Sequence, residues 1–257
     1  MKLNKPLSGF LAVSLLTLGA ANAASVVNWT TTAAASSGLN TDDPVIGSGS
    51  SNSASNVLAY SSLPSSYTLV NVGDTITLTG SLTTLGTSSS SGGIRFGLYN
   101  TNSSSTTANW LGYMATAGSG STAGAIYELA SGNAAYNTTG GGSVSGGTYT
   151  APGTGNNLGS TSSVTYDFTL VLELTAAGEI TITSSLLNTA TNVNYASYTV
   201  VDSSAVTTTF NEVGFSFTSG LAADQVTFSN ITIVPEPSIA LLSGLGVLGL
   251  LRRRRAA

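Results

Sequence analysis

The sequence predicts an all-β domain, an antiparallel β-sandwich or jelly roll, flanked by an apolar helix at each end. Three observations support this fold class. Charged residues make up only 7% of the 257 residues and hydrophobic residues 41%, so the chain can bury a large core. Several segments alternate apolar with hydroxyl-bearing residues, which is the period of a half-buried strand. Clusters of Gly, Ser, Thr and Asn separate these segments and predict turns.

Residues 1–23 have the features of a secretory signal peptide. Lys2 and Lys5 precede an apolar stretch at residues 7–18, and the small residues that end at Ala23 match an A-x-A cleavage pattern. We therefore expect a signal helix that is removed by a cut after Ala23, and an exported protein. An uncleaved membrane helix is the alternative, and the shortness of the apolar stretch disfavours it.

The middle of the chain, residues 24–234, is predicted to form the sandwich. Residues 75–83 and 93–100 alternate strictly, so each stretch places one set of apolar side chains on one face. These sets are Ile76, Leu78 and Leu82 in the first stretch, and Ile94, Phe96 and Leu98 in the second. Arg95 and Tyr99 fall on the opposite face of the second stretch.

The longest alternating stretch covers residues 164–174. A turn at residues 176–178 leads from it into a second alternating run, and this order predicts a β-hairpin. In the last strand the apolar positions change parity between Phe228 and Ile231. A β-bulge near Asn230 would restore the register there.

Absent residue types exclude several kinds of chemistry. The chain has no Cys and no His, which excludes the usual zinc sites and catalysis by Ser-His-Asp or Cys-His groups. Between the two terminal segments Arg95 is the only basic residue, so the middle domain is acidic and would repel nucleic acid and anionic lipid. We identify no metal site, no cofactor motif and no nucleic-acid partner in the sequence.

Glycoside hydrolysis needs two carboxyl groups about 5 to 10 Å apart. The candidates by residue type are Glu128, Asp167, Glu173, Glu179 and Glu212. Asp167 and Glu173 share the polar face of one predicted strand but lie roughly 20 Å apart along it, which is too far for a pair. We favour the interpretation that these acids are solvated and keep a weakly charged surface soluble, so the domain is expected not to be an enzyme.

Two further features are candidates for binding. Arg95 is suited to hold a carboxylate or a pair of sugar hydroxyls, but we favour an ion pair with a cross-strand acid such as Glu173 or Asp167. Trp110 and Tyr113 lie beside a glycine-rich loop and are the first candidates for a carbohydrate contact. Packing in the core is the competing interpretation for most of the other aromatic residues.

The C-terminal segment, residues 235–257, combines Pro235, Glu236 and Pro237 with an apolar run at residues 239–251. The arginines that follow are Arg252, Arg253, Arg254 and Arg255. As a helix the apolar run is roughly 20 Å long, short of the roughly 30 Å hydrocarbon core. The arginines fit the cytoplasmic side of a membrane span, and their long side chains extend a short span. We expect a C-terminal transmembrane helix that holds the precursor in the inner membrane.

This segment closely resembles the PEP-CTERM sorting signal of exported proteins in Gram-negative bacteria that make extracellular polysaccharide. The matching features are the triplet Pro235, Glu236 and Pro237, the short apolar run, the terminal arginines and the accompanying signal peptide. The resemblance implies that a membrane enzyme called exosortase recognises the triplet and cleaves near it. It also implies that the triplet serves recognition and has no catalytic role.

The middle of the chain resembles the concanavalin-like jelly rolls of many exported bacterial proteins. The motifs that carry this resemblance are, in order, GDTITLTGSL, RFGLYN, WLGYMATAGSG, NEVGFSF and VTFSNITIV. We therefore expect a structural protein of the cell surface or extracellular matrix, sorted through its tail and associated with exopolysaccharide. A lectin-like carbohydrate-binding module is the alternative, and a glycoside hydrolase is a remote one.

Overall fold

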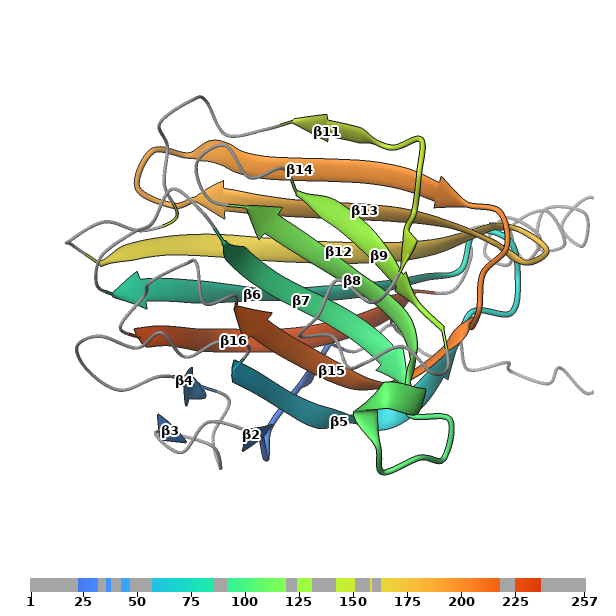
Figure 1. The fold of residues 1–257 in the computed structure, drawn as a ribbon, viewed down its shortest axis with the longest axis horizontal. Coiled ribbons are helices and arrows are strands. Elements are labelled where there is room, and N and C mark those ends of the chain that lie inside the picture. Colours follow the sequence, from blue (N-terminus) through green and yellow to red (C-terminus); the bar gives the residue numbers. More distant parts are fainter. Residues whose placement is uncertain are drawn as a thin grey trace, which may run out of the picture.

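The computed structural model shows two antiparallel β-sheets packed face to face (Figure 1). It describes residues 23–31, 36–37, 43–46, 57–85, 92–118, 124–130, 142–150, 158, 163–217 and 225–236. The predicted all-β sandwich is therefore confirmed for the middle of the chain. The signal peptide and the apolar C-terminal run lie outside the described residues. Within the described part of the chain, no helix has the length and hydropathy that a membrane crossing requires.

One sheet has nine strands and the other seven. The nine-stranded sheet has the order β11 (Thr148–Thr150), β14 (Val193–Asp202), β13 (Glu179–Asn188), β12 (Val164–Ala176), β6 (Thr75–Leu85), β16 (Gln225–Glu236), β4 (Val45–Ile46) and β3 (Ser36–Ser37), with β1 (Ala24–Ser25) beside β16. The seven-stranded sheet has the order β10 (Gly142–Ser143), β9 (Ala125–Leu129), β8 (Leu111–Gly118), β7 (Gly93–Asn100), β15 (Thr209–Phe217), β5 (Val57–Thr68) and β2 (Thr30–Thr31). A short 3₁₀ helix, η1 (Thr107–Asn109), precedes β8.

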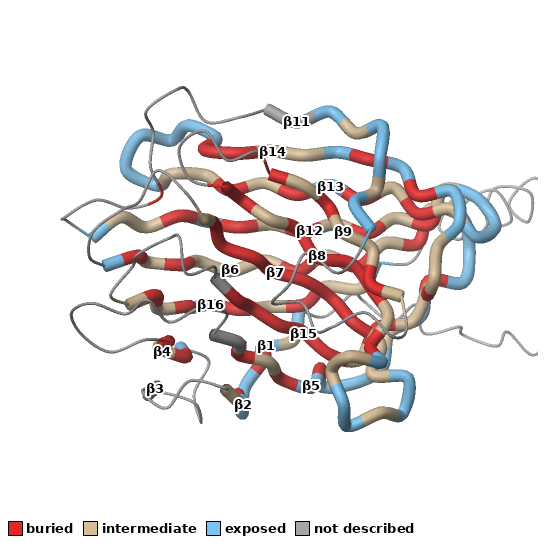
Figure 2. Tube along the Cα trace, viewed as in Figure 1, coloured by how far each residue is buried: buried red, intermediate tan, exposed pale blue. Residues whose placement is uncertain are grey.

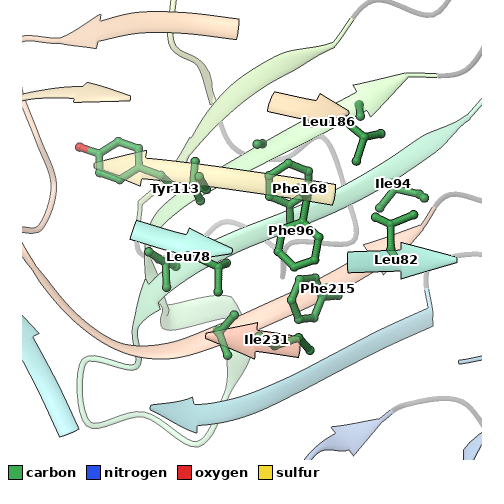
Figure 3. Close-up of a cluster of buried hydrophobic side chains, with 14 of the residues drawn as sticks. Leu78, Leu82, Ile94, Phe96, Tyr113, Phe168, Leu186, Phe215 and Ile231 are labelled. Atoms are coloured by element: carbon green, nitrogen blue, oxygen red, sulfur yellow. The ribbon is translucent and has the colours of Figure 1, made fainter. Parts of the chain in front are cut away.

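The core lies between the two sheets and is built from the alternating apolar residues of the strands. Figure 2 shows buried positions alternating with partly buried ones along several strands. Phenylalanine rings from both sheets meet at its centre (Figure 3). The ring of Phe168 on β12 lies 5.2 Å from that of Phe96 on β7 and 5.3 Å from that of Phe215 on β15. Phe215 in turn stacks on Phe228 of β16 at 4.3 Å. These offset and edge contacts join the sheets by direct ring packing.

Hydroxyl-bearing residues cover the outer side of the nine-stranded sheet. Threonines form hydrogen-bonded pairs across neighbouring strands, at 2.9 Å between the Oγ1 atoms of Thr79 and Thr232 and at 2.9 Å between those of Thr83 and Thr165. Ser81 Oγ donates to Asp167 Oδ1 at 2.6 Å. Such cross-strand pairs stabilise a sheet without charge, which explains how a chain with 7% charged residues covers its surface.

The local predictions for two irregular positions are confirmed. The hairpin joins β12 to β13, and Gly178 in its turn has φ 74°, a conformation that favours glycine. In β16 the pairing with β6 shifts register between Ser229 and Thr232, and Asn230 has φ 53°. This is the predicted bulge, and it brings the apolar residues on both sides of it to the same buried face.

The predicted ion pair of Arg95 with Asp167 or Glu173 is wrong. Arg95 lies on β7 in the seven-stranded sheet, whereas Asp167 and Glu173 lie on β12 in the nine-stranded sheet. The cross-strand neighbours of Arg95 are Thr116 and Ser216. Alternation in a sequence indicates which residues share a face of a strand, but it does not indicate which strands share a sheet.

Candidate functional site

The outer face of the seven-stranded sheet, the side turned away from the nine-stranded sheet, carries a second cluster of buried side chains. Its members are Tyr99, Trp110, Met114 and Leu129, with Tyr60 and Tyr127 packed against them. The inward residues Ile94, Phe96 and Leu98 of β7 belong to the main core instead. Both faces of β7 are therefore buried, although only one would be buried in a simple half-exposed strand.

Tyr99 is the centre of this outer-face cluster. Its ring folds back over Gly97, and a Cβ at position 97 would collide with the Tyr99 hydroxyl and with the main-chain oxygen of Tyr113. Trp110 then packs on Tyr99 at 5.9 Å and, edge to face, on Tyr60 at 5.4 Å. The missing side chain at position 97 thus allows an aromatic layer to lie close against the sheet.

Glu212 is a buried acid on the same outer face. It lies on β15, where its cross-strand neighbours are Ser62 on β5 and Tyr99 on β7. Its side chain is 4% exposed, and Ser62 Oγ donates to its Oε2 at 3.0 Å. Burial raises the pKa of the Glu212 carboxyl to about 7, and the hydrogen bond from Ser62 offsets part of that increase.

Arg95 also lies on the outer face and is 6% exposed. Burial lowers the pKa of its guanidinium, and interactions with Tyr127 and Tyr99 oppose this effect. Arg95 and Glu212 are both buried ionisable residues on this outer face, and buried ionisable groups with shifted pKa values are candidates for a functional site. Within the described residues, no group of three or more His, Cys, Asp or Glu is placed to hold a metal ion.

A polar cluster lies between the two sheets, at the end of the sandwich where β14 ends. Tyr113 donates its hydroxyl hydrogen to Asp202 Oδ2 at 2.6 Å, and Asp202 also shares a hydrogen bond with Glu128. Main-chain N–H groups of Ser204 and Val206 donate to Asp202 Oδ1 at 3.0 Å and to Glu128 Oε1 at 3.1 Å. This cluster joins β8, β9 and β14, and hence the two sheets.

The two acids of this cluster titrate differently. Burial, and after it the interaction with Asp202, raises the pKa of the Glu128 carboxyl to about 7. Burial would raise the pKa of Asp202 as well, but hydrogen bonds from Tyr113, Ser204 and Glu128 outweigh it and lower that pKa. A protonated Glu128 beside an ionised Asp202 is the arrangement that permits a hydrogen bond between two carboxyl groups.

The two acids with raised pKa values, Glu128 and Glu212, are not placed as a glycoside-hydrolase pair. Glu128 and Asp202 are hydrogen-bonded to each other, so no sugar fits between them. Glu128 has the inward parity of Ile126, whereas Glu212 faces outward, so these two acids lie on opposite sides of one sheet. Asp167 and Glu173 lie on the outer side of the other sheet.

The structure does not bring the predicted sugar contacts, Trp110 and Tyr113, together on one surface. Tyr113 is 0% exposed and points between the sheets toward Asp202, whereas Trp110 is 3% exposed on the outer face, where its Nε1 donates to Ser104 O at 3.2 Å. The physical reason is that Trp110, in extended backbone just before β8, and Tyr113 on β8 are three positions apart, so their side chains leave opposite faces. The prediction grouped Trp110 and Tyr113 because they are close in the chain, but residues close in the chain can face opposite sides of a sheet.

Sequence reasoning also missed the buried state of Glu212 and Glu128. For Glu128 the local pattern is misleading, because its apolar neighbours Tyr127 and Leu129 would be expected on the core face but lie on the outer face. No local signal indicates that Glu212 is covered, because its burial depends on side chains from β5 and β7.

The predicted sorting triplet begins inside the sandwich. Strand β16 continues past residue 234, with Pro235 paired to Ile76 and Glu236 to Thr75 of β6. On its other side β1 pairs Ala24 with Ile233. Pro237 and the four arginines lie outside the described residues.

Comparison with solved structures confirms the concanavalin-like fold of the middle region. The lectin UEA-II in complex with galactose aligns with a TM-score of 0.51 at 11% identity, covering 85% of this chain and 99% of that one. Lectin I from Ulex europaeus, in complex with the methyl glycoside of α-L-fucose, aligns with a TM-score of 0.48 at 12% identity over 84% and 97% of the two chains. An alginate lyase from Aplysia kurodai aligns with a TM-score of 0.44 at 11% identity over 78% and 86%. At these identities the similarity shows the fold alone, a lectin-like β-sandwich.

The C-terminal segment identifies the chain more specifically. Residues 234–255 match the model of the PEP-CTERM protein-sorting motif, so the chain carries this motif. The predicted resemblance is thereby confirmed over those residues. Among curated proteins, none matches this sequence.

Proposed function

We propose that this chain is an exported structural protein of the cell surface or extracellular matrix, sorted through its C-terminal tail and not acting as an enzyme. The observation that carries the proposal is the PEP-CTERM motif at residues 234–255. In this proposal residues 239–251 hold the precursor in the inner membrane until exosortase cleaves near Pro235, Glu236 and Pro237. The released sandwich then associates with exopolysaccharide.

The arrangement of the chain ends supports the proposal. Ala24, the first residue after the predicted signal cleavage, pairs with Ile233, which lies just before the sorting motif. Two terminal cuts therefore leave a sandwich whose first and last strands are already paired. The positions of the acids support the non-enzymatic part, since the two carboxyls with raised pKa values, Glu128 and Glu212, face opposite sides of a sheet and cannot act on one sugar.

Mass spectrometry of the surface-released protein tests this proposal. We expect a chain that begins at Ala24 and lacks Arg252, Arg253, Arg254 and Arg255. The matched variant replaces the triplet residue Glu236 by Gln, and we expect more of it to stay with the membrane fraction. A released wild-type protein that still carries the four arginines would show that the tail is not cleaved.

Carbohydrate binding is the second candidate, and the aromatic cluster on the outer face favours it. Tyr60 and Tyr127 are half-buried and pack against the cluster that contains Trp110, and aromatic side chains of this kind commonly stack on sugar rings. A glycan array with the wild-type protein and the Trp110→Ala variant tests this candidate, with circular dichroism showing that the variant is folded. Binding that disappears in the folded variant would favour a lectin-like module over a structural role.

A further inference from the structure

The turn between β5 and β6 presents two valines to solvent. Val70 is 70% exposed and Val72 is 58% exposed, the former being the largest exposure among the exposed large hydrophobic residues. The turn is firmly held, because Asp74 Oδ2 accepts hydrogen bonds from the N–H groups of Val70 at 2.9 Å and Asn71 at 2.8 Å. The Gly73 N–H donates to Leu174 O on the adjacent strand at 2.7 Å. Neither valine contributes to the two buried clusters.

This turn lies at the end of the sandwich where the C-terminal tail leaves. Glu236 pairs with Thr75, which directly follows Asp74 at the base of the turn. Because β16 runs antiparallel to β6, the C-terminal end of β16 at Glu236 lies at the base of this turn. Ala24 pairs with Ile233, so the N-terminal end of β1 lies at the same end of the sandwich. In Figure 1 this is the end at which β6 begins.

The tail is too short to separate this end from the membrane. The apolar run begins at residue 239, and three Cα–Cα steps from Glu236 span at most about 11 Å. Neighbouring strands are about 4.8 Å apart. With the apolar run in the bilayer, the turn that carries Val70 and Val72 is therefore held next to the lipid headgroups.

We propose that the turn at Val70 and Val72 is a membrane-contacting tip, at which the anchored precursor inserts two valines into the headgroup region of the bilayer. This inference rests on the proposed function, since it requires the tail to lie in the membrane. The partner is a zwitterionic phospholipid surface, because the acids at this end of the sheet, Glu173, Glu179 and Glu236, disfavour anionic lipid.

An exposed valine at the opposite end provides a matched control. Val193 is 60% exposed and pairs with Asn188 at the connection between β13 and β14. That connection lies far along the strands from Thr75, because Asn188 pairs with Tyr166 and Tyr166 with Leu82. Val193 therefore matches Val72 in residue type and exposure but points away from the proposed membrane.

The chain contains no cysteine, which permits single-site labelling. The full-length chain with Val72→Cys, or with Val193→Cys, is labelled with an environment-sensitive fluorophore and reconstituted into phosphatidylcholine vesicles containing a headgroup spin label. We expect a blue-shifted emission at position 72 and quenching about twofold or more stronger than at position 193, as for a side chain in the headgroup region. Flotation of the vesicles measures anchoring independently of the fluorophore.

The outcomes separate this inference from the proposed function. If the chain floats with the vesicles but the label at position 72 is as exposed to water as the label at position 193, the contact is overturned and tail anchoring stands. If the chain does not float with the vesicles, tail anchoring itself is overturned, and the membrane contact with it.

Discussion

Glu212 should make the stability of this protein depend on pH within a defined window. Its carboxyl is 4% exposed, and burial raises its pKa from 4.5 to about 7. Below about pH 4.5 the group is protonated in both the folded and the unfolded state. The fold then has its full stability with respect to this group. Between pH 4.5 and 7 the folded state keeps a proton that the unfolded state has lost. The free energy of unfolding therefore falls as the pH rises through this window and levels off above it.

The magnitude follows from the difference between the two pKa values. At about 1.36 kcal/mol for each pKa unit, the interval from 4.5 to about 7 corresponds to an upper limit of about 3 kcal/mol. Relaxation of the site and water penetration reduce such a value, so we expect about 1 to 2 kcal/mol. Glu212→Gln removes the titrating group while keeping nearly the same shape and the neighbouring Ser62 hydroxyl.

The assay is urea denaturation of the wild-type protein and Glu212→Gln at several values between pH 4 and pH 8, with the difference in unfolding free energy as the readout. Glu128 titrates in the same range but is present in both proteins, so its contribution cancels. We expect the variant to gain about 1 to 2 kcal/mol relative to the wild type across the window. Ser62→Ala removes the hydrogen bond that lowers the pKa of Glu212 in the folded state, so it should extend the upper limit of the window to higher pH. A difference between wild type and Glu212→Gln that stays constant with pH would refute the reasoning.

Two further substitutions test the aromatic packing on the outer face and the polar cluster between the sheets. Gly97→Ala places a methyl group against the Tyr99 hydroxyl and the main-chain oxygen of Tyr113, and should destabilise the fold by about 1 to 3 kcal/mol. Gly142→Ala is the matched control, because a Cβ added there meets no described atom within 4 Å apart from its chain neighbours. It should change the unfolding free energy by less than about 0.5 kcal/mol. Equal effects of the two substitutions would contradict the role assigned to Gly97. Tyr113→Phe removes the hydrogen bond to Asp202 and should cost about 1 to 3 kcal/mol in urea denaturation near pH 7. An unchanged midpoint would show that the bond does not join the two sheets energetically.

Much of the fold follows from local patterns in the sequence. Alternation identified the inward residues Ile76, Leu78 and Leu82, all of which are 0% exposed. A change of parity located the bulge at Asn230, and a small-residue turn located the hairpin near Gly178. These features depend on residues close together in the chain, and the sequence displays such residues directly.

The candidate site follows less well, because it depends on which strands become neighbours. Arg95 was expected beside the acids of β12, but strand order placed it in the other sheet. Trp110 and Tyr113 are close in sequence, yet they face opposite sides of β8. The burial of Glu212 results from its neighbours on β5 and β7, which come from distant parts of the chain.

By itself, the sequence determined the class of fold, the absence of His and Cys chemistry, and the sorting motif at residues 234–255. Each of these depends on composition or on a contiguous stretch. Only the tertiary structure decided that Glu128 pairs with Asp202 and that Pro235 and Glu236 still belong to a strand. It also decided that the turn at Val70 and Val72 lies beside the exit of the tail. The reason is that strand pairing and the packing of the two sheets bring together residues far apart in the chain, and no local period records which strands become neighbours.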